Sequence, residues 1–262
     1  MPELPEVETV VRSLLPVIVG QRILHAEFRQ LRILAGDAAE TAEALAGQRI
    51  IGIVRHGKFI AIHLERGFLI VHLGMTGRLL IDAAPTKWTH ALFTLEHNLL
   101  HFDDPRQFGR IEYGATLPER VARLGPEPLE VSLAEFTWRI RQRKSPIKAV
   151  LLNQLVVRGV GNIYADEALF RAGVHPGRLA SALTKPRIAK IYDAMREVLS
   201  EAIESRGSSV SDYVDADGRK GDFQSRHRVY QRGGEPCVTC GTAIVRIVLT
   251  QRGTHFCAVC QK

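Results

Sequence analysis

The pattern of hydrophobic and polar positions divides the chain into an N-terminal helix, a β-rich region and a helical region. Over residues 3–19, apolar side chains recur at the spacing of one helical face, and Gly20 ends the pattern. From residue 23 to about residue 113, short apolar runs separated by turns replace that spacing. Repeated short runs of this kind predict a β-sandwich or a β-barrel. The clearest runs are 50–54, 59–64, 68–73, 91–95 and 99–102.

The stretch 124–128, which reads Leu-Gly-Pro-Glu-Pro, predicts a linker, and the pattern after it is helical. Ser132 is a candidate N-cap for a helix that runs to about Lys144, and a proline two residues later fits the first turn of the next helix. Asn162 opens a third helix, and residues 184–205 form a longer one. The chain is therefore predicted to be an α+β protein with domains at 1–124, 125–228 and 229–262.

Composition and charge restrict the class of protein. A chain of 262 residues is long for one compact core, and a hydrophobic content of 45% excludes general disorder. The apolar runs are far too short to span a membrane, and the N-terminus lacks the basic and apolar regions of a secretory signal. The net charge of +7 suits a polyanionic partner such as nucleic acid, although this balance alone is weak support.

All four cysteines lie near the C-terminus, in two Cys-x-x-Cys pairs. The pairs are Cys237 with Cys240 and Cys257 with Cys260, and their spacing is typical of a four-thiolate zinc ribbon. Two disulfides are the alternative, but they would require an oxidising compartment, for which the N-terminus carries no signal. The sequence therefore predicts one structural Zn²⁺ with no open coordination position for bond chemistry.

The N-terminus, Met-Pro-Glu-Leu-Pro-Glu, carries the first candidate for covalent chemistry. Removal of Met1 would leave Pro2 with a terminal secondary amine. Since an α-amino group titrates at about pH 8, a usable fraction is unprotonated at neutral pH. Such an amine can attack a sugar C1′ or a carbonyl and form a Schiff base, with Glu3 beside it to shuttle protons. The alternative is a frayed terminus in which both residues merely open a helix.

Three predicted turns carry candidate contacts with a nucleic acid. Lys58 follows a glycine, where it could be a second amine, a phosphate contact or an ordinary surface lysine. Met75 lies between two glycines; an apolar tip of this kind can wedge between base steps, whereas most methionines fill cores. Arg106 could fill the gap left by an extruded base while Phe108 wedges the opposite stack. The alternative buries Phe108 beneath a proline turn.

The helical region offers a site for phosphate. Residues 157–162, Val-Arg-Gly-Val-Gly-Asn, place two glycines before a helix N-terminus, where backbone N–H groups bind anions. Lys144 and Lys148 flank a proline and are candidate phosphate contacts, or else the solvated basic end of a helix. Arg252 lies in the predicted turn of the cysteine-rich hairpin, 250–254, where it suits phosphate recognition or plain solubility.

Six motifs occur together in one order: MPELPEVET, HLGMTG, DPRQFG, GVGNIYADEALF, VDADGRKGDF and the pair CVTC and CAVC. In this combination the whole chain resembles the bacterial formamidopyrimidine-DNA glycosylase family, the helix-two-turn-helix enzymes that excise 8-oxoguanine. The endonuclease VIII branch is less similar, since its start usually reads Pro-Glu-Gly-Pro. The resemblance implies an N-terminal helix with a β-sandwich domain, followed by a helix-two-turn-helix domain with a zinc-finger hairpin.

The resemblance also implies a role for each candidate residue. Pro2 would attack C1′ of the damaged nucleotide, and Glu3 would handle protons. Lys58 would support β-elimination, and Arg252 would bind phosphate and assist δ-elimination. The segment 211–223 would be a mobile loop that closes over the extruded base. The other candidates match the family's DNA contacts, as wedge and gap-filling residues or as further contacts with the DNA: Met75, His90, Arg106, Phe108, Lys144, Lys148 and Asn162.

One position departs from the family pattern. The family motif commonly carries Arg or Lys after Asp-Pro-Arg, whereas Gln107 stands there in this chain. Arg106 and Phe108 are retained. The change therefore bears on a nearby charge contact and on the preference for the opposite base, and it leaves the chemistry intact.

The implied function is that of a bifunctional DNA glycosylase and apurinic/apyrimidinic lyase of base excision repair. It would excise 8-oxoguanine and formamidopyrimidines from double-stranded DNA through a Schiff base on Pro2, act on abasic sites, and nick the strand by β,δ-elimination. The alternatives are a non-catalytic damaged-DNA-binding protein on the same scaffold and a related glycosylase for oxidised pyrimidines. Retention of Pro2 and Glu3 favours the enzyme. We expect a cytoplasmic, DNA-associated monomer with no membrane partner.

Overall fold

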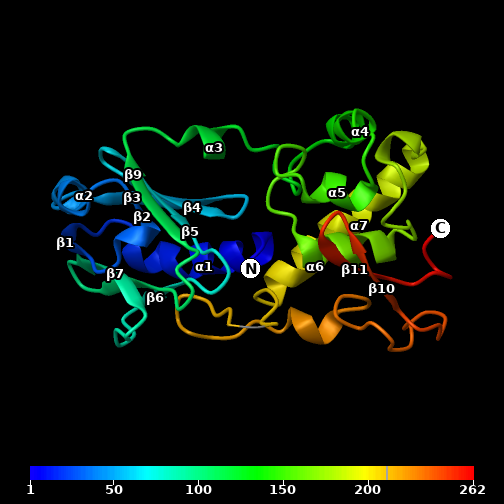
Figure 1. The fold of residues 1–262 in the computed structure, drawn as a ribbon. Coiled ribbons are helices and arrows are strands. Elements are labelled where there is room, and N and C mark those ends of the chain that lie inside the picture. Colours follow the sequence, from blue (N-terminus) through cyan, green and yellow to red (C-terminus); the bar gives the residue numbers. More distant parts are fainter. Residues whose placement is uncertain (211) are drawn as a thin grey trace. The chain divides into compact units, whose positions relative to one another are not determined.

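The chain folds into two compact units (Figure 1). The computed structural model describes residues 1–210 and 212–262. The first unit contains Met1–Arg123 and Ser205–Asp222, and the second contains Leu124–Glu204 and Phe223–Lys262. The second unit begins at the predicted linker, but residues 205–222, which the sequence pattern assigned to the second domain, return to the first unit. Among the described residues, no helix is both long and apolar enough to cross a membrane.

The N-terminal helix of the first unit, α1 (Leu4–Ile18), forms where the apolar spacing predicts it. Its N-cap is Glu3, whose backbone N–H donates to Glu6 Oε2 at 2.7 Å within a capping box. Leu14 is fully buried, whereas Leu15 is 49% exposed, so α1 is amphipathic.

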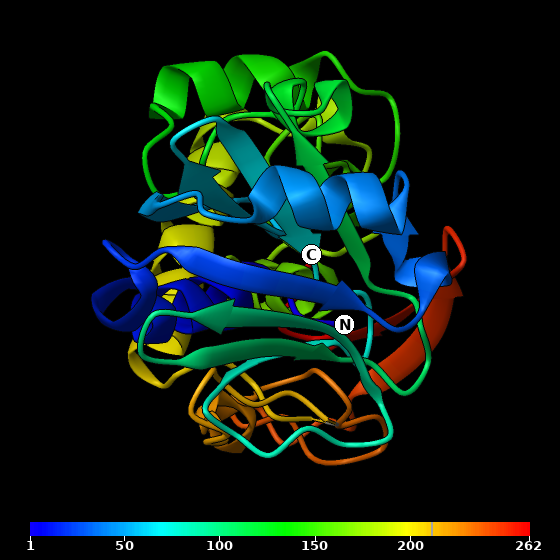
Figure 2. The same cartoon turned by 90° about the vertical axis from the view of Figure 1, so that its left-hand side faces the viewer.

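Two sheets make up most of the first unit (Figure 2). The four-stranded sheet has the order β1-β7-β8-β6, and the five-stranded sheet has the order β2-β9-β5-β4-β3. Neighbouring strands are antiparallel except β2 and β9. The strands are β1 (Ile23–Phe28), β2 (Leu34–Ala35), β3 (Ile50–His56), β4 (Phe59–Leu64), β5 (Gly67–His72), β6 (Arg78–Ile81), β7 (Thr89–Leu95), β8 (Leu99–Asp103) and β9 (Arg110–Gly114).

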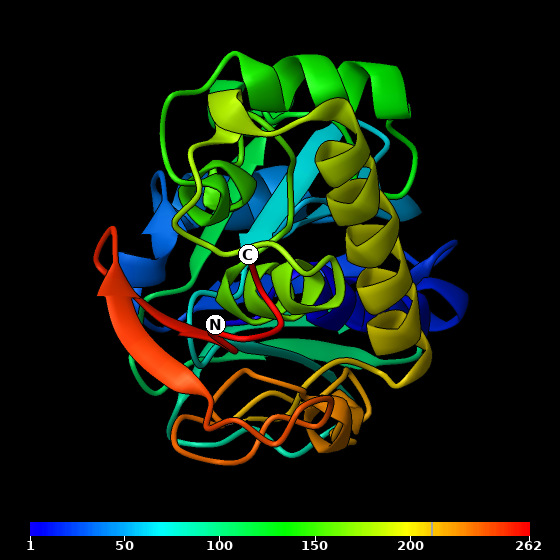
Figure 3. The same cartoon turned by 90° about the vertical axis from the view of Figure 1, so that its right-hand side faces the viewer.

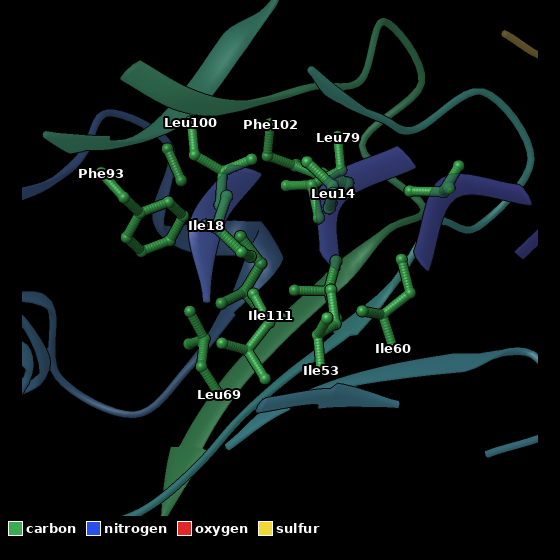
Figure 4. Packing of buried hydrophobic residues seen from close by; sticks show 14 of the residues in the cluster. Leu14, Ile18, Ile53, Ile60, Leu69, Leu79, Phe93, Leu100, Phe102 and Ile111 are labelled. Atoms are coloured by element: carbon green, nitrogen blue, oxygen red, sulfur yellow. The ribbon is translucent and has the colours of Figure 1, made fainter. Parts of the chain in front are cut away.

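One apolar cluster fills the first unit. Leu14 and Ile18 of α1 lie between side chains of the two sheets, with Phe93 and Leu100 on one side and Ile111 on the other (Figure 4). All of these side chains are at least 99% buried, so the helix closes the space between the sheets. Three short elements on this unit were not predicted: η1 (Leu31–Ile33), α2 (Ala38–Leu45) and α3 (Glu119–Ala122).

The second unit is mainly helical (Figure 3). Ser132 caps the first of its α-helices as predicted, since its Oγ accepts from the Glu135 N–H at 3.2 Å; that helix ends at Arg141, before the predicted Lys144. The longest helix begins at Lys185, close to the predicted start. The elements are α4 (Leu133–Arg141), α5 (Ile147–Leu152), α6 (Asn162–Arg171), η2 (Ala180–Ala182), α7 (Lys185–Glu204) and η3 (Phe223–Arg226).

A hairpin of β10 (Val245–Leu249) and β11 (Arg252–Phe256) ends the second unit. Its turn consists of Thr250 and Gln251, which both adopt positive φ angles, of 48° and 61°. The predicted turn, 250–254, was therefore too long, because Arg252 already pairs with Leu249 as the first residue of β11.

Candidate functional site

The first two candidates lie at the start of α1. Pro2 is buried and Glu3 is 4% exposed, whereas Met1 is 50% exposed. The N-terminus is therefore not frayed: the capping box between Glu3 and Glu6 holds it in place. Removal of the exposed Met1 would leave the Pro2 nitrogen as the end of an ordered chain.

Glu6 is a residue that the sequence interpretation did not single out. It is 1% exposed, and its Oε1 accepts from the Ser208 N–H at 2.7 Å. A Cβ atom on Gly207 would lie 2.8 Å from the same oxygen, so only glycine allows this close approach. The Tyr213 hydroxyl donates to the Glu6 carbonyl at 3.2 Å, and burial raises the pKa of that hydroxyl. Glu6 therefore ties the segment 205–222 to the start of α1.

Lys58 lies on a pair of strands that packs against α1. It occupies the two-residue turn between β3 and β4 and is 9% exposed. In the same region, Arg55 Nε donates to Glu8 Oε2 at 2.9 Å, which fixes the end of β3 beside the second turn of α1. Burial, together with the charge of Lys58, lowers the pKa of His72 to about 4. The strand pair that carries Lys58 is thus attached to α1, the helix that begins after Pro2 and Glu3.

The candidate wedge residues lie on two loops that pack directly together. Met75 is 41% exposed, as its position between glycines predicts, and Phe108 is 45% exposed, which removes the alternative of a buried Phe108. Arg106 is exposed and its guanidinium lies 4.7 Å from the centre of the Phe108 ring. A Cβ atom on Gly74 would lie 2.6 Å from the Gly109 nitrogen, which shows how closely the loops approach.

Asp104, the first residue of the DPRQFG motif, organises these loops, a role that the motif did not indicate. Its side chain is fully buried: Oδ1 accepts from Thr76 Oγ1 at 2.5 Å, and Oδ2 accepts from the Gly109 N–H at 2.7 Å. His90, a predicted DNA contact, is 6% exposed, and its Nε2 lies 2.9 Å from the Asp104 carbonyl oxygen. One carboxylate therefore fixes the Met75 loop and the Phe108 loop, while its backbone carbonyl holds His90.

In the second unit, the glycine-led entry to α6 lies where the sequence places it. Gly161 is the N-cap, and Gly159 donates its N–H to Gln154 Oε1 at 2.7 Å. The Asn162 Nδ2 donates to the Gly253 carbonyl at 2.9 Å, so α6 is joined to β11. Lys144 is exposed beyond the end of α4.

The two remaining basic candidates differ sharply in exposure. Arg252 is exposed at the start of β11. Lys148, predicted to contact the DNA backbone, is fully buried, and its Nζ lies 2.7 Å from Asp166 Oδ1. The sequence shows a lysine near a helix start but not that a buried carboxylate lies opposite it.

The four cysteines form a site that fits zinc. Their sulfur atoms lie within 4.8 Å of one another, with Cys237 Sγ 3.9 Å from Cys260 Sγ and Cys240 Sγ 3.5 Å from Cys257 Sγ. A tetrahedral Zn²⁺ with Zn–S bonds of about 2.3 Å needs sulfur–sulfur distances of about 3.8 Å, and a disulfide needs about 2 Å. The cysteines therefore hold a structural zinc, and the disulfide alternative is wrong.

The predicted mobile loop, 211–223, begins at Ser211, which lies outside the described residues. Two of its described members, Tyr213 and Ala216, are buried in the apolar cluster of the first unit, at 7% and 0% exposure. Arg219 donates its N–H to Asp215 Oδ1 at 2.8 Å, which shapes the turn between them.

Comparison with protein families matches three consecutive parts of the chain. The profile of the formamidopyrimidine-DNA glycosylase N-terminal domain matches residues 1–111, and that of the formamidopyrimidine-DNA glycosylase H2TH domain matches residues 124–214. A zinc finger found in FPG and IleRS matches residues 234–262. The chain is 59% identical to the formamidopyrimidine-DNA glycosylase of Solibacter usitatus and 46% identical to that of Thermus thermophilus. The alignments cover 100% of this chain in both cases, and 100% and 98% of the two relatives.

Solved structures show the same similarity. The MutM (FPG) protein from Thermus thermophilus superposes with a TM-score of 0.91 at 44% identity, covering 99% of this chain and 98% of that one. A Lactococcus lactis FPG mutant in complex with Fapy-dG containing DNA superposes with a TM-score of 0.93 at 37% identity over 100% of both chains. A Lactococcus lactis Fpg complex with abasic site containing DNA gives a TM-score of 0.91 at 37% identity over 99% of both chains.

Proposed function

This chain belongs to the formamidopyrimidine-DNA glycosylase family, and on this premise we propose that it is a bifunctional DNA glycosylase and apurinic/apyrimidinic lyase. It excises 8-oxoguanine and formamidopyrimidines from double-stranded DNA and then nicks the strand in base excision repair. Relatives solved with Fapy-dG and with abasic DNA support duplex DNA as the partner. The protein acts as a monomer in the cytoplasm, bound to DNA.

The observation that carries this proposal is the ordered N-terminus. Pro2 and Glu3 are buried at the start of α1, and Lys58 lies in the turn of the β3–β4 pair, which packs against that helix. An amine nucleophile, a carboxylate for proton transfer and a second cation are the three groups that Schiff-base chemistry at a sugar requires. Glu6 holds these groups in place, because its carboxylate binds both Glu3 and residues 205–222, the returning segment.

The groups act in sequence. After removal of Met1, the Pro2 nitrogen attacks C1′, the bond between C1′ and the base breaks, and the base leaves with a proton. Glu3 transfers protons as the sugar opens, which leaves an iminium between Pro2 and C1′. Loss of a C2′ proton then expels the 3′ phosphate, and a second elimination expels the 5′ phosphate. Lys58 supports the first elimination and Arg252 the second by neutralising the departing phosphates.

Extrusion of the damaged base costs a few kcal/mol, and exposed side chains offset this cost by occupying the vacated stack. Met75, Arg106 and Phe108 have the exposure that this role needs. Asp104 positions them because it fixes both loops from below. A wedge that is already ordered loses little conformational entropy when it enters the DNA.

The second unit binds the DNA backbone. Arg252 and Lys144 are exposed cations, and the glycine-led start of α6 offers backbone N–H groups to a phosphate. The division of labour follows the predicted domains, except that residues 205–222 join the catalytic domain: a catalytic domain at 1–124, a helix-two-turn-helix DNA-binding domain at 125–228 and a zinc finger at 229–262. The zinc maintains the hairpin that carries Arg252 and does no bond chemistry.

Borohydride trapping on a duplex with 8-oxoguanine opposite cytosine tests this function. Wild type should give a covalent protein–DNA adduct, and Pro2→Gly should give much less while it still binds the duplex, because its primary amine is no longer fixed by the proline ring. Pro85→Gly is the matched control, because Pro85 is an exposed loop proline and its replacement should leave trapping unchanged. Mass spectrometry should show that Met1 is absent from the adduct.

If wild type binds the duplex but forms no adduct, catalysis through Pro2 is wrong, and a non-catalytic DNA-binding protein takes its place. If an adduct forms on a duplex with an oxidised pyrimidine and not on 8-oxoguanine, the chemistry stands and the proposed substrate is wrong.

A further inference from the structure

A buried polar cluster joins α5 and α6 to β11 in the second unit. It consists of Lys148, Asp166, Thr254 and His255, with exposed fractions of 0%, 1%, 0% and 7%, and we call it the Lys148 cluster. Lys148 Nζ lies 2.7 Å from Asp166 Oδ1. Asp166 Oδ2 accepts from the His255 backbone N–H at 2.9 Å and lies 3.2 Å from His255 Nδ1. A lysine of α5 and an aspartate of α6 therefore bind the same strand.

The cluster holds the two residues that directly follow Arg252. Lys148 Nζ donates to the Gly253 carbonyl at 2.9 Å and to Thr254 Oγ1 at 2.8 Å. Asn162 Nδ2 donates to the same Gly253 carbonyl, also at 2.9 Å. The exposed guanidinium of Arg252 is therefore attached to a backbone that side chains of α5 and α6 hold by hydrogen bonds.

Stability alone does not require charges at this place. A buried ion pair loses hydration energy that its attraction roughly offsets, and well-packed apolar side chains of similar volume often stabilise as well or better. Charged groups instead fix the position of the backbone to which they bind, because they donate and accept hydrogen bonds at fixed atoms. The hairpin needs such fixed contacts, since two isolated five-residue strands are marginally stable and slip easily in register.

We propose that Lys148, Asp166 and His255 are positioning residues that set the guanidinium of Arg252 for contact with a DNA phosphate. This inference depends on the phosphate-binding role of Arg252 in the proposed function. It also gives Lys148 a different part from the one the sequence suggests: its ammonium acts through the β11 backbone and does not touch the DNA.

The salt dependence of DNA binding separates these roles. Each phosphate contact contributes about 0.9 to the slope of log affinity against log salt concentration. The double substitution K148M/D166L removes one positive and one negative charge, so the net charge stays the same. A reduced slope in this variant means either that Arg252 is displaced or that Lys148 itself contacts a phosphate, and combination with R252A separates the two. We expect the slope of K148M/D166L to fall by about 0.9, the value of one phosphate contact, and its affinity for DNA to fall roughly tenfold. We expect the same two changes in R252A.

The decisive variant combines the two changes. K148M/D166L/R252A should bind DNA no more weakly than R252A alone, because the cluster acts only through Arg252. The positioning role is wrong, and Lys148 acts on its own, if the losses of affinity in K148M/D166L and R252A add in the combined variant. The same conclusion follows if the slope of the combined variant falls by the value of a second phosphate contact. If R252A changes neither affinity nor slope, the phosphate-binding role of Arg252 fails, and the positioning role fails with it.

Controls separate positioning from general weakening of the fold. R171M/E201L removes another ion pair of the second unit, between α6 and α7, in which Arg171 Nη2 lies 2.6 Å from Glu201 Oε2. It should leave the slope unchanged. Zinc content and circular dichroism should match wild type in every variant. If K148M/D166L does not fold, T254V replaces it, since it removes the hydroxyl that accepts from Lys148 and donates to the Arg252 carbonyl. T254V should then lower affinity in the presence of Arg252 and have no effect in R252A; an equal effect in both backgrounds would overturn the inference.

Discussion

The first unit and the zinc hairpin differ in what fills their interiors. One apolar cluster runs through the first unit from Val7 in α1 to Ala216 in the returning segment and draws on both sheets. Around the hairpin, the described residues form a small apolar cluster: Phe170, Val229, Cys237, Ile244 and Cys257. Two of these five are zinc ligands. Burial of apolar surface therefore stabilises the first unit, whereas the hairpin depends on a metal and on directed polar bonds.

Removal of zinc should have the largest effect, and it should fall on the hairpin and the helices bonded to it while it spares the first unit. Structural zinc contributes on the order of 10 kcal/mol to the folding of small zinc modules, which the five-residue apolar cluster cannot replace. Chelation or Cys257→Ser should therefore unfold β10 and β11 and abolish DNA binding. Amide hydrogen exchange of both units, with zinc measured in parallel, checks this outcome.

The matched control for the zinc ligand is Val259→Ser, because Val259 lies between Cys257 and Cys260 and is 50% exposed. This substitution should keep both zinc and DNA binding. Unchanged DNA binding after verified zinc loss would refute the dependence of the hairpin on the metal. Loss of protection throughout the first unit would refute the independence of its apolar core.

Truncation of the apolar core should have the second largest effect and should spare the zinc. Leu14 is fully buried between the two sheets, so Leu14→Ala should lower the free energy of unfolding by about 3 kcal/mol. Leu15→Ala, on the exposed side of the same helix, should change it by less than about 0.5 kcal/mol. Urea unfolding measures both, and equal losses at the two positions would contradict the packing of α1 between the sheets.

The sequence predicts the first unit better than the contacts that organise the site, and the reason is the range of the interactions. The helix α1 and the strands β3, β4, β5, β7 and β8 follow from local periodicity, which a single stretch of sequence contains. The return of residues 205–222 depends on Glu6, Gly207 and Ser208 meeting across the fold. No local pattern encodes a contact between residues so far apart, so the sequence did not indicate that this segment returns to the first unit.

The same limit applies to individual site residues. The exposure of Met75 follows from two adjacent glycines and was predicted, but the buried carboxylate of Asp104 that fixes its loop was not. The short helix α2 was missed because it is rich in alanine and buries few apolar side chains. The buried state of Lys148 depends on Asp166 in the next helix, which only the folded structure brings within 2.7 Å.

Acid should weaken both units by a similar amount, which tests whether the contrast between them is confined to their apolar interiors. Burial holds the pKa of His72 in the first unit and of His227 in the second at about 4. The unfolded histidine binds its proton at about pH 6.5, so each stabilises the fold above that pH and loses its contribution as the pH falls toward 4. Each of these two histidines should lower the free energy of unfolding by about 2 kcal/mol at pH 5 relative to pH 7.

Substitution of one histidine separates the units. His72→Gln should reduce the loss of stability between pH 7 and pH 5 in the first unit and leave the second unit as in wild type, measured by urea unfolding at both values. His25→Gln is the control, because His25 is an exposed histidine of the same unit. An identical pH dependence in His72→Gln and wild type would show that the buried imidazole does not limit stability in acid.

Loss of a helix cap should have the smallest effect and should be equal in the two units. Asp37 caps α2 by accepting from the Ala39 and Glu40 N–H groups at 2.8 and 3.0 Å, and Ser132 caps α4 by accepting from the Glu135 N–H at 3.2 Å. Asp37→Ala and Ser132→Ala should each cost about 1 kcal/mol, whereas Asp37→Asn and Ser132→Thr keep an acceptor and should cost little. Urea midpoints of the two units measure the losses. Equal losses in Asp37→Ala and Ser132→Ala would show that the first unit and the hairpin differ in their interiors and not in their helix caps. A several-fold larger loss for Ser132→Ala would show that the second unit depends on local helix signals as well as on zinc.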